Sequence, residues 1–415
     1  MTPEIKQRIE QIRRGEVPER YVKTALGLAP TDWKRYTFGD IYTERKEPGD
    51  ENLPLLMVSI HSGVSDGEVD AAELPKQVKR IEDKSQYKKA VSGDLVFNMM
   101  RAWQGAIGTV RTTGMVSPAY IVAEPNDKAY PLFMDYYSRT PQMINQLDRQ
   151  SYGVTDFRKR LYWDSFAPIG CILPPIEEQQ KIATILTTQD KVIKLKEKRL
   201  AEKQRQKKYL MQQLLTGKKR LPGFNGAWKT DCLGKLFFER KETNCENIEM
   251  LAITGTQGII PRKELDLKDN SSEDKSKYLR VCVGDIGYNT MRMWQGVSAY
   301  SNYGGIVSPA YTILKPSSSI NAKYFAYLFK MSEIVFLFYR FSQGLVDDTR
   351  NLKYENFKKI KVCYPPDMKE QTAIAEVLSA ADHEIDLLQQ DIEQEKQKKK
   401  ALMQLLLTGI VRVKT

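Results

Sequence analysis

The sequence predicts an α+β fold: two similar mixed α/β domains separated by two long helices, which form an antiparallel coiled coil with pseudo-twofold symmetry. Three observations lead to this prediction. Residues 174–217 read as one long helix, and residues 365–409 read as a second helix with the same pattern. The chain before each helix carries the same short motifs. The predicted order is therefore domain, helix, domain, helix along 415 residues.

Residues 1–29 are predicted to form a helical lead that packs on the end of the coiled coil. Ile5, Ile9 and Ile12 have the spacing of one helix face, and Gly15 follows where that helix would end. Val17-Pro18 and then Trp33 echo Leu221-Pro222-Gly223 and Trp228, so we interpret the lead as a partial third copy of the end of the long helix.

Residues 30–173 predict the first mixed domain. The apolar segments 55–60 and 94–98 look like strands, and residues 131–147 look like a short amphipathic helix. Residues 221–364 repeat this domain, at an offset of 191 in the clearest stretch. The recurring motifs are Gly-Asp…Arg-x-Trp-Gln-Gly at 93–105 and 284–296, Ser-Pro-Ala-Tyr at 117–120 and 308–311, and Glu-Arg-Lys-Glu at 44–47 and 239–242.

Residues 174–220 form the predicted central helical region and residues 365–415 the C-terminal one. A Pro-Pro pair opens each helix and Leu-Thr-Gly closes it, as helix start and stop signals do. Two unrelated amphipathic helices, each packed on its own domain, are the alternative. Apolar residues recur with coiled-coil spacing and with an offset of 192 between the helices. The expected seam residues are Ile182, Leu186, Ile193, Leu200, Leu210, Leu214, Ile374, Leu378, Ile385, Ile392, Leu402 and Leu406.

Composition favours a nucleic-acid partner. Lysine and arginine number 64 against 52 acidic residues, which gives a net charge of +12 and favours a polyanion. The five cysteines include no C-x-x-C pair, so neither structural zinc nor disulfides are expected. No apolar run reaches the roughly 18 residues of a membrane span, and the start lacks a signal-peptide pattern. We therefore expect a cytoplasmic protein.

A two-fold protein with a basic helix suits a nucleic-acid duplex, whose backbone is itself two-fold. Residues shared by the two domains cannot by themselves distinguish two different half-sites of such a duplex. The repeated arginine and glutamine are therefore expected to contact phosphates or scaffold, and specificity is expected from divergent loops. Those loops are 59–89 against 254–278 and 150–160 against 341–351. The repeated Trp103 and Trp294 are expected in the domain cores, not stacked on bases. The candidate DNA-binding residues are Arg101, Gln104, Arg149, Arg158, Lys159, Arg160, Arg292, Gln295, Arg340 and Arg350.

Catalytic, cofactor-binding and metal sites are not predicted. The sequence has no glycine-rich dinucleotide loop, no phosphate-binding loop and no Asn/Asp-Pro-Pro-aromatic motif of amino-methyltransferases. Two alternatives stay open. One is a self-sufficient nuclease that uses Asp40, Glu44 and Lys46, although Lys235 replaces Asp40 in the second copy. The other is a coiled-coil scaffold that does not contact DNA.

These motifs together resemble those of the specificity subunit of type I restriction–modification systems. The resemblance covers the whole chain and includes Pro-Pro…Glu-Gln…Ile-Ala and Leu-Leu-Thr-Gly at both helices. It implies two target-recognition domains, each reading half of a bipartite DNA site, with helices that set the spacer and dock modification subunits. The resemblance also implies S-adenosylmethionine in the modification subunits and ATP and Mg in restriction subunits. It implies no chemistry in this chain.

Overall fold

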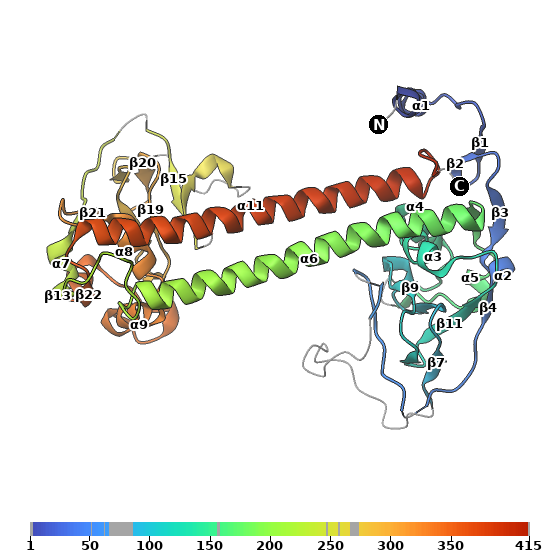
Figure 1. Cartoon of the computed structure of the whole chain (residues 1–415), viewed down its shortest axis with the longest axis horizontal. Coiled ribbons are helices and arrows are strands. Elements are labelled where there is room, and N and C mark those ends of the chain that lie inside the picture. The colour runs from blue at the N-terminus through green and yellow to red at the C-terminus, as the bar shows by residue number, and fades with distance from the viewer. Residues whose placement is uncertain are drawn as a thin grey trace. The chain divides into compact units, whose positions relative to one another are not determined.

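A computed structural model gives the fold as two compact units, Met1–Leu195 with Ile392–Thr415, and Lys196–Asp391. The first is called unit 1 and the second unit 2. Each contains one globular domain and part of both long helices, α6 (Ile176–Leu214) and α11 (Met368–Leu406) (Figure 1). The structure describes residues 3–50, 52–61, 63–65, 86–155, 158–245, 248–255, 258–265 and 274–413.

The domain of unit 1 is built on a four-stranded antiparallel sheet with the order β4-β11-β8-β9. Smaller two-stranded ladders join β3 to β12, β5 to β6 and β7 to β10. The elements in chain order are β3 (Lys34–Thr37), α2 (Phe38–Ile41), β4 (Tyr42–Glu44), β5 (Val58–Ser59), β6 (Gly63–Val64), β7 (Lys88–Ala90), β8 (Leu95–Asn98), η2 (Ala102–Gln104), β9 (Ile107–Thr109), β10 (Gly114–Val116), β11 (Tyr120–Pro125), α3 (Pro131–Tyr137), α4 (Pro141–Arg149), α5 (Trp163–Phe166) and β12 (Gly170–Leu173).

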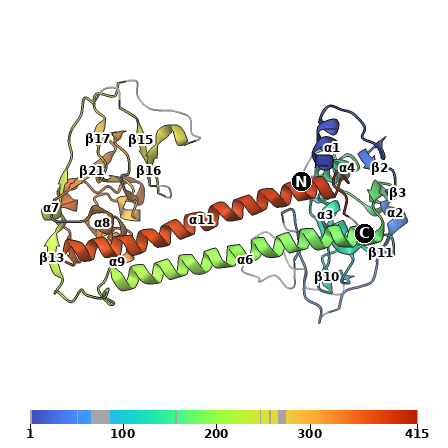
Figure 2. The ribbon, with the colours of Figure 1, turned by 45° about the horizontal axis from the view of Figure 1, so that its top comes forward.

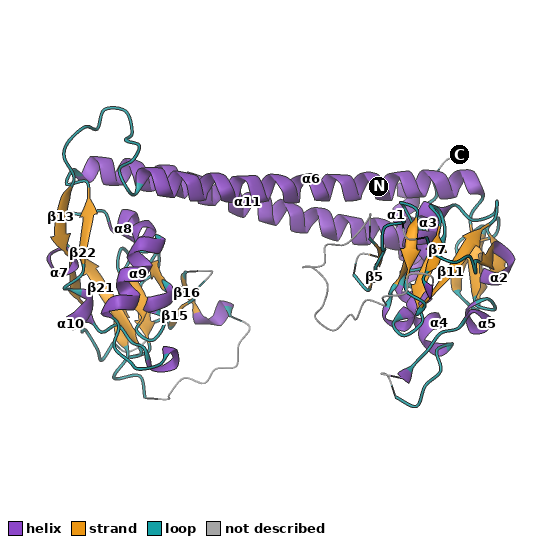
Figure 3. Ribbon diagram, turned by 90° about the horizontal axis from the view of Figure 1, so that it is seen from below, coloured by secondary structure: helices purple, strands orange, loops and turns teal. Residues whose placement is uncertain are grey.

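Unit 2 repeats this topology. Its four-stranded sheet has the order β14-β21-β18-β19, and α8 packs on β19 as α3 packs on β9 in unit 1. Figure 3 shows the helices and strands of each domain. The elements are β13 (Lys229–Cys232), α7 (Leu233–Leu236), β14 (Phe237–Glu239), β15 (Leu251–Ile253), β16 (Ile259–Pro261), η4 (Arg262–Glu264), β17 (Leu279–Val281), β18 (Ile286–Asn289), η5 (Met293–Gln295), β19 (Ser298–Tyr300), β20 (Gly305–Val307), β21 (Tyr311–Pro316), α8 (Ala322–Leu328), α9 (Ser332–Phe341), η6 (Asp347–Thr349), α10 (Tyr354–Phe357) and β22 (Lys361–Tyr364).

The single helix predicted over residues 131–147 is two helices, α3 and α4. Pro141 stands in the first turn of α4, and Thr140 caps it by accepting a hydrogen bond from the amide of Met143. A proline inside a continuous helix would remove a backbone hydrogen bond and clash with the preceding turn. The chain therefore starts a new helix there. Part of the predicted loop 59–89, residues 62 and 66–85, lies outside the described residues, as do 256–257 and 266–273 of its counterpart.

Polar contacts show that the helix segments of unit 1 run antiparallel. Gln189 Nε2 lies 2.6 Å from Glu395 Oε2, and Asp190 Oδ1 lies 2.6 Å from Lys399 Nζ. Residues early in α6 thus face residues late in α11.

Unit 2 shows the same orientation through ion pairs. Lys196 Nζ lies 2.7 Å from Asp391 Oδ1, and Lys203 Nζ lies 2.9 Å from Glu384 Oε2. These lysines belong to the basic stretch that the sequence places on the first long helix. Acidic residues of α11 therefore neutralise part of that stretch.

The predicted seam residues lie in two environments. Those near the helix ends are part of the two large apolar cores, which also contain the sheets and short helices of each domain: Ile182, Leu186, Leu402 and Leu406 in unit 1, and Leu210, Leu214, Ile374 and Leu378 in unit 2. The central ones, Ile193, Ile385 and Ile392, are buried outside those cores, and Leu200 is half-buried. The helices are thus held by the domains at their ends as well as by each other.

A buried glutamine joins each domain to its long helix. In unit 1, Gln179 accepts a hydrogen bond from the amide of Tyr130 (2.8 Å) and donates to the carbonyls of Lys128 and Pro174 (2.9 Å each). Its side chain therefore satisfies three backbone groups where the helix begins. The counterpart in unit 2 is Gln371, with the amide of Asn321 (2.7 Å) and the carbonyl of Pro365 (2.8 Å).

An arginine that follows each long helix clamps the start of the other one. In unit 1, Arg412 pairs with the buried Glu178 (2.7 Å) and with Asp32 (2.7 Å), and it lies 5.9 Å from the ring centre of Trp33. The counterpart in unit 2 is Arg220, with Glu370 at 2.7 Å and Trp228 at 5.6 Å. The same clamp thus appears twice.

The N-terminal lead lies beside the end of α11 (Figure 2). It consists of α1 (Pro3–Arg13) and the hairpin β1 (Tyr21–Thr24)–β2 (Gly27–Pro30). Arg8 donates to the carbonyl of Ile410 at 3.0 Å, and the Tyr21 hydroxyl donates to that of Gly409 at 2.7 Å. No residue of α1 is buried, but Ala29 of β2 packs in a small apolar cluster with Trp33 and Ile172, so the lead is fixed by this cluster and by polar contacts with the chain after α11. Within the described ranges, no helix combines the length and apolarity needed to cross a bilayer.

Cys171 is expected to resist alkylation in the native protein. It is fully buried in the unit 1 core, and that burial raises the pKa of its thiol to about 12. Because the thiolate is the nucleophile, iodoacetamide at pH 8 should label Cys171 at least about tenfold more slowly than the exposed Cys363. Peptide mass spectrometry over time measures both rates, and urea should equalise them. Equal rates without urea would contradict the buried position.

Candidate nucleic-acid interface

The turn that follows β8 in unit 1, residues 98–105, recurs after β18 in unit 2, at residues 289–296. Asn98 shapes the first by accepting a hydrogen bond from the amide of Met100 at 2.8 Å, and the half-buried Trp103 donates to the carbonyl of Met100 at 3.0 Å. Asn289 and Trp294 make the same two bonds, at 2.9 and 3.0 Å. The tryptophans thus support the turn through their ring N–H groups, and both are half-buried beside the apolar cores, not inside them as the sequence predicted.

These turns expose the repeated arginine and glutamine. Arg101 and Gln104 in unit 1, and Arg292 and Gln295 in unit 2, have exposed side chains. The structure shows neither arginine in an ion pair with any residue that it describes. Two unpaired guanidinium groups are therefore available at equivalent positions of the two domains.

A short hairpin lies against each turn, described at residues 152–155 and 158–160 in unit 1 and at 343–351 in unit 2. Backbone bridges join Tyr152 to Arg160 and Gln343 to Asn351. A hydrogen bond of 2.9 Å from the amide of Leu161 to the carbonyl of Met99 fastens the first hairpin to its turn. The bond from Leu352 to Thr290, at 2.8 Å, does the same in unit 2. Turn and hairpin thus form one surface in each domain.

Glycine is required inside both hairpins. A Cβ atom on Gly153 would lie 2.5 Å from the backbone of Arg158, and one on Gly344 would lie 2.6 Å from the carbonyl oxygen of Thr349. The next residues, Val154 and Leu345, are 92% and 99% exposed. These apolar tips were not predicted, although Ser-x-Gly followed by an apolar residue occurs in both copies of the repeat.

Two of the candidate cations are held inside their own domains. Lys159 lies 2.7 Å from Asp148 Oδ1 and 4.9 Å from the ring centre of Trp103. Arg350 lies 2.9 Å from Asp347 Oδ1 and 4.1 Å from the ring centre of Tyr339. Both occupy the same place in the repeat and stiffen the hairpin. The remaining candidates are Arg149, Arg158 and Arg340, which are exposed, and Arg160, which is half-buried and donates to the carbonyl of Lys159.

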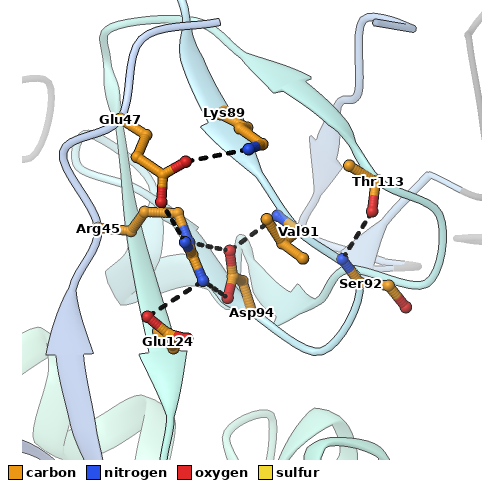
Figure 4. Close-up of polar contacts among 8 residues, drawn as sticks. All are labelled: Arg45, Glu47, Lys89, Val91, Ser92, Asp94, Thr113 and Glu124. Carbon is orange, nitrogen blue, oxygen red and sulfur yellow. Dashed lines mark hydrogen bonds and ion pairs between the residues drawn. The ribbon is translucent and has the colours of Figure 1, made fainter.

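A buried aspartate and its arginine partner form an ion-pair network in each domain, shown for unit 1 in Figure 4. Arg45 Nε lies 2.8 Å from Asp94 Oδ2, which also accepts a hydrogen bond from the amide of Val91 at 2.8 Å. Burial raises the pKa of Asp94, and the guanidinium of Arg45 opposes that rise. Arg240 and Asp285 repeat the pair at 2.7 Å. The repeated Glu-Arg-Lys-Glu and Gly-Asp motifs therefore stabilise the domains.

The sequence model of the type I restriction modification DNA specificity domain matches residues 70–205 and 234–397. These two matches cover more than half of the chain, one in each copy of the repeat.

The chain belongs to this family. It is a specificity subunit of a type I restriction–modification system, with two target-recognition domains and no catalytic role of its own. As such it binds double-stranded DNA and assembles with modification and restriction subunits. The resemblance drawn from the sequence is thus confirmed.

Curated relatives match over nearly their full length. The putative type I restriction enzyme MjaX specificity subunit of Methanocaldococcus jannaschii is 24% identical, over 96% of this chain and 98% of the relative. The MjaVIII specificity subunit of the same organism is also 24% identical, over 95% and 97%.

Two solved structures share the fold. The S subunit of a type I restriction–modification system from M. genitalium has a TM-score of 0.56 and 12% identity, over 90% of this chain and 96% of that chain. A chain from a study of complex assembly and conformational transition of the type I R-M system has a TM-score of 0.52 and 17% identity, over 92% and 99%.

The nuclease alternative does not fit a specificity subunit or the local geometry. Asp40 caps the short helix α2, because its carboxylate accepts hydrogen bonds from the amide and hydroxyl of Thr37 at 2.7 and 2.8 Å. Glu44 pairs with Lys46 at 3.1 Å. Among the residues that the structure describes, no three His, Cys, Asp or Glu side chains come together as a metal site. The three residues therefore have structural partners instead of a shared ligand.

Proposed function

We propose that each domain, residues 30–173 and 221–364, reads one half of a bipartite DNA target, while the helical regions 174–220 and 365–415 set the gap between the halves. The observation that carries this proposal is the element-by-element repeat, in which the same scaffold presents different hairpin sequences. A shared scaffold with divergent surface loops suits the reading of two different sequences.

Within each domain the turn and the hairpin have different roles. The unpaired Arg101 and Arg292, with Gln104 and Gln295, contact the phosphate backbone, which positions each domain on the duplex. The hairpins and adjacent helix ends read base edges, since arginine binds guanine in the major groove. The proposed base-reading residues are Arg149, Arg158, Arg160 and Arg340. Lys159 and Arg350 hold the hairpins in place.

The exposed faces of α6 and α11 dock the modification subunits. Those subunits carry S-adenosylmethionine and methylate adenine, and the restriction subunits use ATP and Mg²⁺. This division of labour agrees with a chain whose repeated buried motifs serve the fold. Because the substrate is chromosomal or invading DNA, the compartment of action is the cytoplasm.

Co-expression with the modification subunit, followed by genome-wide methylation mapping, tests the proposal. We expect one methylated motif with two short specified halves and an unspecified gap of fixed length. Exchanging residues 150–160 for those of another specificity subunit should change one half only. A continuous motif, or a change in both halves, would contradict the assignment of one half to each domain.

Replacing Arg101 by alanine should weaken binding to all DNA sequences alike. A lost phosphate contact releases one counterion fewer, so the slope of log K against log salt should fall by about 1. Arg292→Ala is the matched variant in unit 2 and should behave in the same way. Fluorescence anisotropy of the complex with modification subunits, at several salt concentrations, measures the slope. An unchanged slope with altered base preference would show that Arg101 reads bases, and salt-independent affinity would favour the scaffold function.

A further inference from the structure

Unit 1 contains a carboxylate that is shared by two arginines and one backbone amide. Asp135, on α3, is 4% exposed and lies 3.2 Å from both Arg111 Nη2 and Arg139 Nη2. Its Oδ1 also accepts a hydrogen bond from the amide of Thr109, at the end of β9, at 3.0 Å. One internal anion thus satisfies a group of cationic and amide donors.

The equivalent place in unit 2 has lost that carboxylate. Matching contacts establish which residues of the two domains are equivalent there. Tyr136 on α3 and Tyr327 on α8 each donate a hydrogen bond to an aspartate of a long helix, at 2.6 and 2.7 Å. With this register Ala326 stands at the position of Asp135, and the other counterparts are Asn302 for Arg111, Lys330 for Arg139 and Tyr300 for Thr109. A cation remains, but the anion between the donors is gone.

The amide of Tyr300 is left without an acceptor. In the β18–β19 ladder, Ser301 donates to the carbonyl of Asp285, and Tyr300 stands opposite Ile286. Antiparallel ladders alternate, so Tyr300 belongs to the pair whose amides point away from the partner strand. Because β19 is at the edge of its sheet, that amide faces outward, as the amide of Thr109 does in unit 1. No residue that the structure describes accepts its hydrogen.

A pocket of about 490 Å³ lies at this place in unit 2. Ser298 lines it, and within the described part of the chain its fully buried hydroxyl has no hydrogen-bond partner. Lys330 also lines it, with its ammonium 2.8 Å from the carbonyl of Gly296. An ammonium has three hydrogens, so donors remain for a ligand. The pocket therefore offers an amide and an ammonium that lack an anionic partner among the described residues.

The charges around the pocket favour an anion. Its lining includes the lysines Lys207, Lys323 and Lys330 and the aspartates Asp382 and Asp386. Lys207 and Asp382 form an ion pair with each other, so they cancel. The remaining charged groups are two lysines, Lys323 and Lys330, and one aspartate, Asp386, which is exposed to solvent. The lining therefore has an excess of positive charge.

We propose that this pocket binds a small oxyanion, a phosphate or carboxylate group, which occupies the place that Asp135 fills in unit 1. The anion accepts hydrogen bonds from the amide of Tyr300 and the ammonium of Lys330. It is an external ligand because unit 2 replaces the internal carboxylate by a methyl group, that of Ala326. The lining includes Thr254, Gly255 and Gly258 of the divergent loop 254–278, so the site borders a proposed DNA-reading surface, and its binding of a free oxyanion goes beyond the proposed function.

The test supplies the missing carboxylate from within the chain. Titration calorimetry of the full-length protein with inorganic phosphate, and separately with acetate, at constant ionic strength should show saturable binding to one site. Ala326→Asp should weaken phosphate binding at least about tenfold, because the new carboxylate takes the donors and repels the ligand. Chloride at the same ionic strength is the control for screening.

The mirror variant Asp135→Ala should create a second site in unit 1. There phosphate or acetate should restore part of the lost thermal stability, and Asp135→Asn should respond less because its amide keeps an acceptor for Thr109. If Asp135→Ala does not fold, Ala326→Asp still decides the question. Absence of saturable phosphate binding to the wild type, or equal binding by Ala326→Asp, would overturn the proposal.

Discussion

Replacing Arg412 by methionine is expected to lower the free energy of unfolding of unit 1 by about 3 kcal/mol, because it leaves a buried carboxylate without its counter-ion. Glu178 is 1% exposed and takes two hydrogen bonds from this guanidinium, at 2.8 and 2.7 Å. Methionine keeps much of the apolar part of the arginine side chain, so the lost free energy of unfolding measures the contribution of the charge. Urea unfolding followed by fluorescence measures the change.

A double-mutant cycle separates the pair from other effects. Glu178→Gln removes the buried charge, so Arg412→Met should cost much less in that background. Arg220→Met is the matched variant of unit 2 and should lower the stability of that unit instead. Equal costs of Arg412→Met with and without Glu178 would show that the buried pair does not carry the effect.

The clamp also gives the stability of unit 1 a dependence on pH. The hydrogen bond from Arg412 holds the pKa of Asp32 below its ordinary value of 3.8. A carboxylate with a lowered pKa contributes stability above its ordinary pKa and loses that contribution as the pH falls through the lower value. The stability difference between wild type and Arg412→Met should therefore shrink below about pH 4. A constant difference down to pH 2 would contradict this assignment.

Inserting four residues into both long helices, after Glu197 in α6 and after Gln389 in α11, should lengthen the gap of the recognised motif by one or two base pairs. Four residues add about 6 Å to a helix, and one base-pair step is about 3.4 Å. The original motif should lose at least about hundredfold in methylation, because one domain then misses its bases and each mismatch costs roughly 1–3 kcal/mol. Methylation mapping in cells measures both results.

Placing the insertions at facing positions keeps the two helices paired, since coiled coils accept four-residue insertions as a local change of winding. Substituting four exposed residues there without an insertion is the control, and it should leave the motif unchanged. An insertion that alters either half of the motif and preserves the gap would contradict the role of the helices as a spacer.

Much of the architecture could be predicted because it is local and repeated. The Pro-Pro start and Leu-Thr-Gly end of each helix depend on backbone chemistry within a few residues, and the structure places α6 and α11 between those signals. The offset of 191 identified the second domain, because equivalent residues face equivalent neighbours in both copies. The prediction of one helix over 131–147 was wrong because the apolar periodicity continues through Pro141, at which the chain starts a new helix.

The details of the candidate interface could not be predicted, because they depend on contacts between distant segments. Lys159 and Arg350 were candidate DNA-binding residues, with a surface salt bridge as the alternative for each, and the structure shows each beside an aspartate and an aromatic ring. Nothing in the local pattern distinguishes them from Arg101. In the same way, the pairing of Arg412 with Glu178 joins residues more than two hundred positions apart.

The glutamines that join the domains to the helices bear on how such subunits can exchange parts. Gln179 and Gln371 bond to amides and carbonyls of the main chain, at Tyr130 and Asn321 among others. Main-chain groups are present whatever side chains a domain carries. Recombination that joins an unrelated recognition domain to the same two long helices therefore keeps these hydrogen bonds. New specificities can then arise by exchange of whole domains.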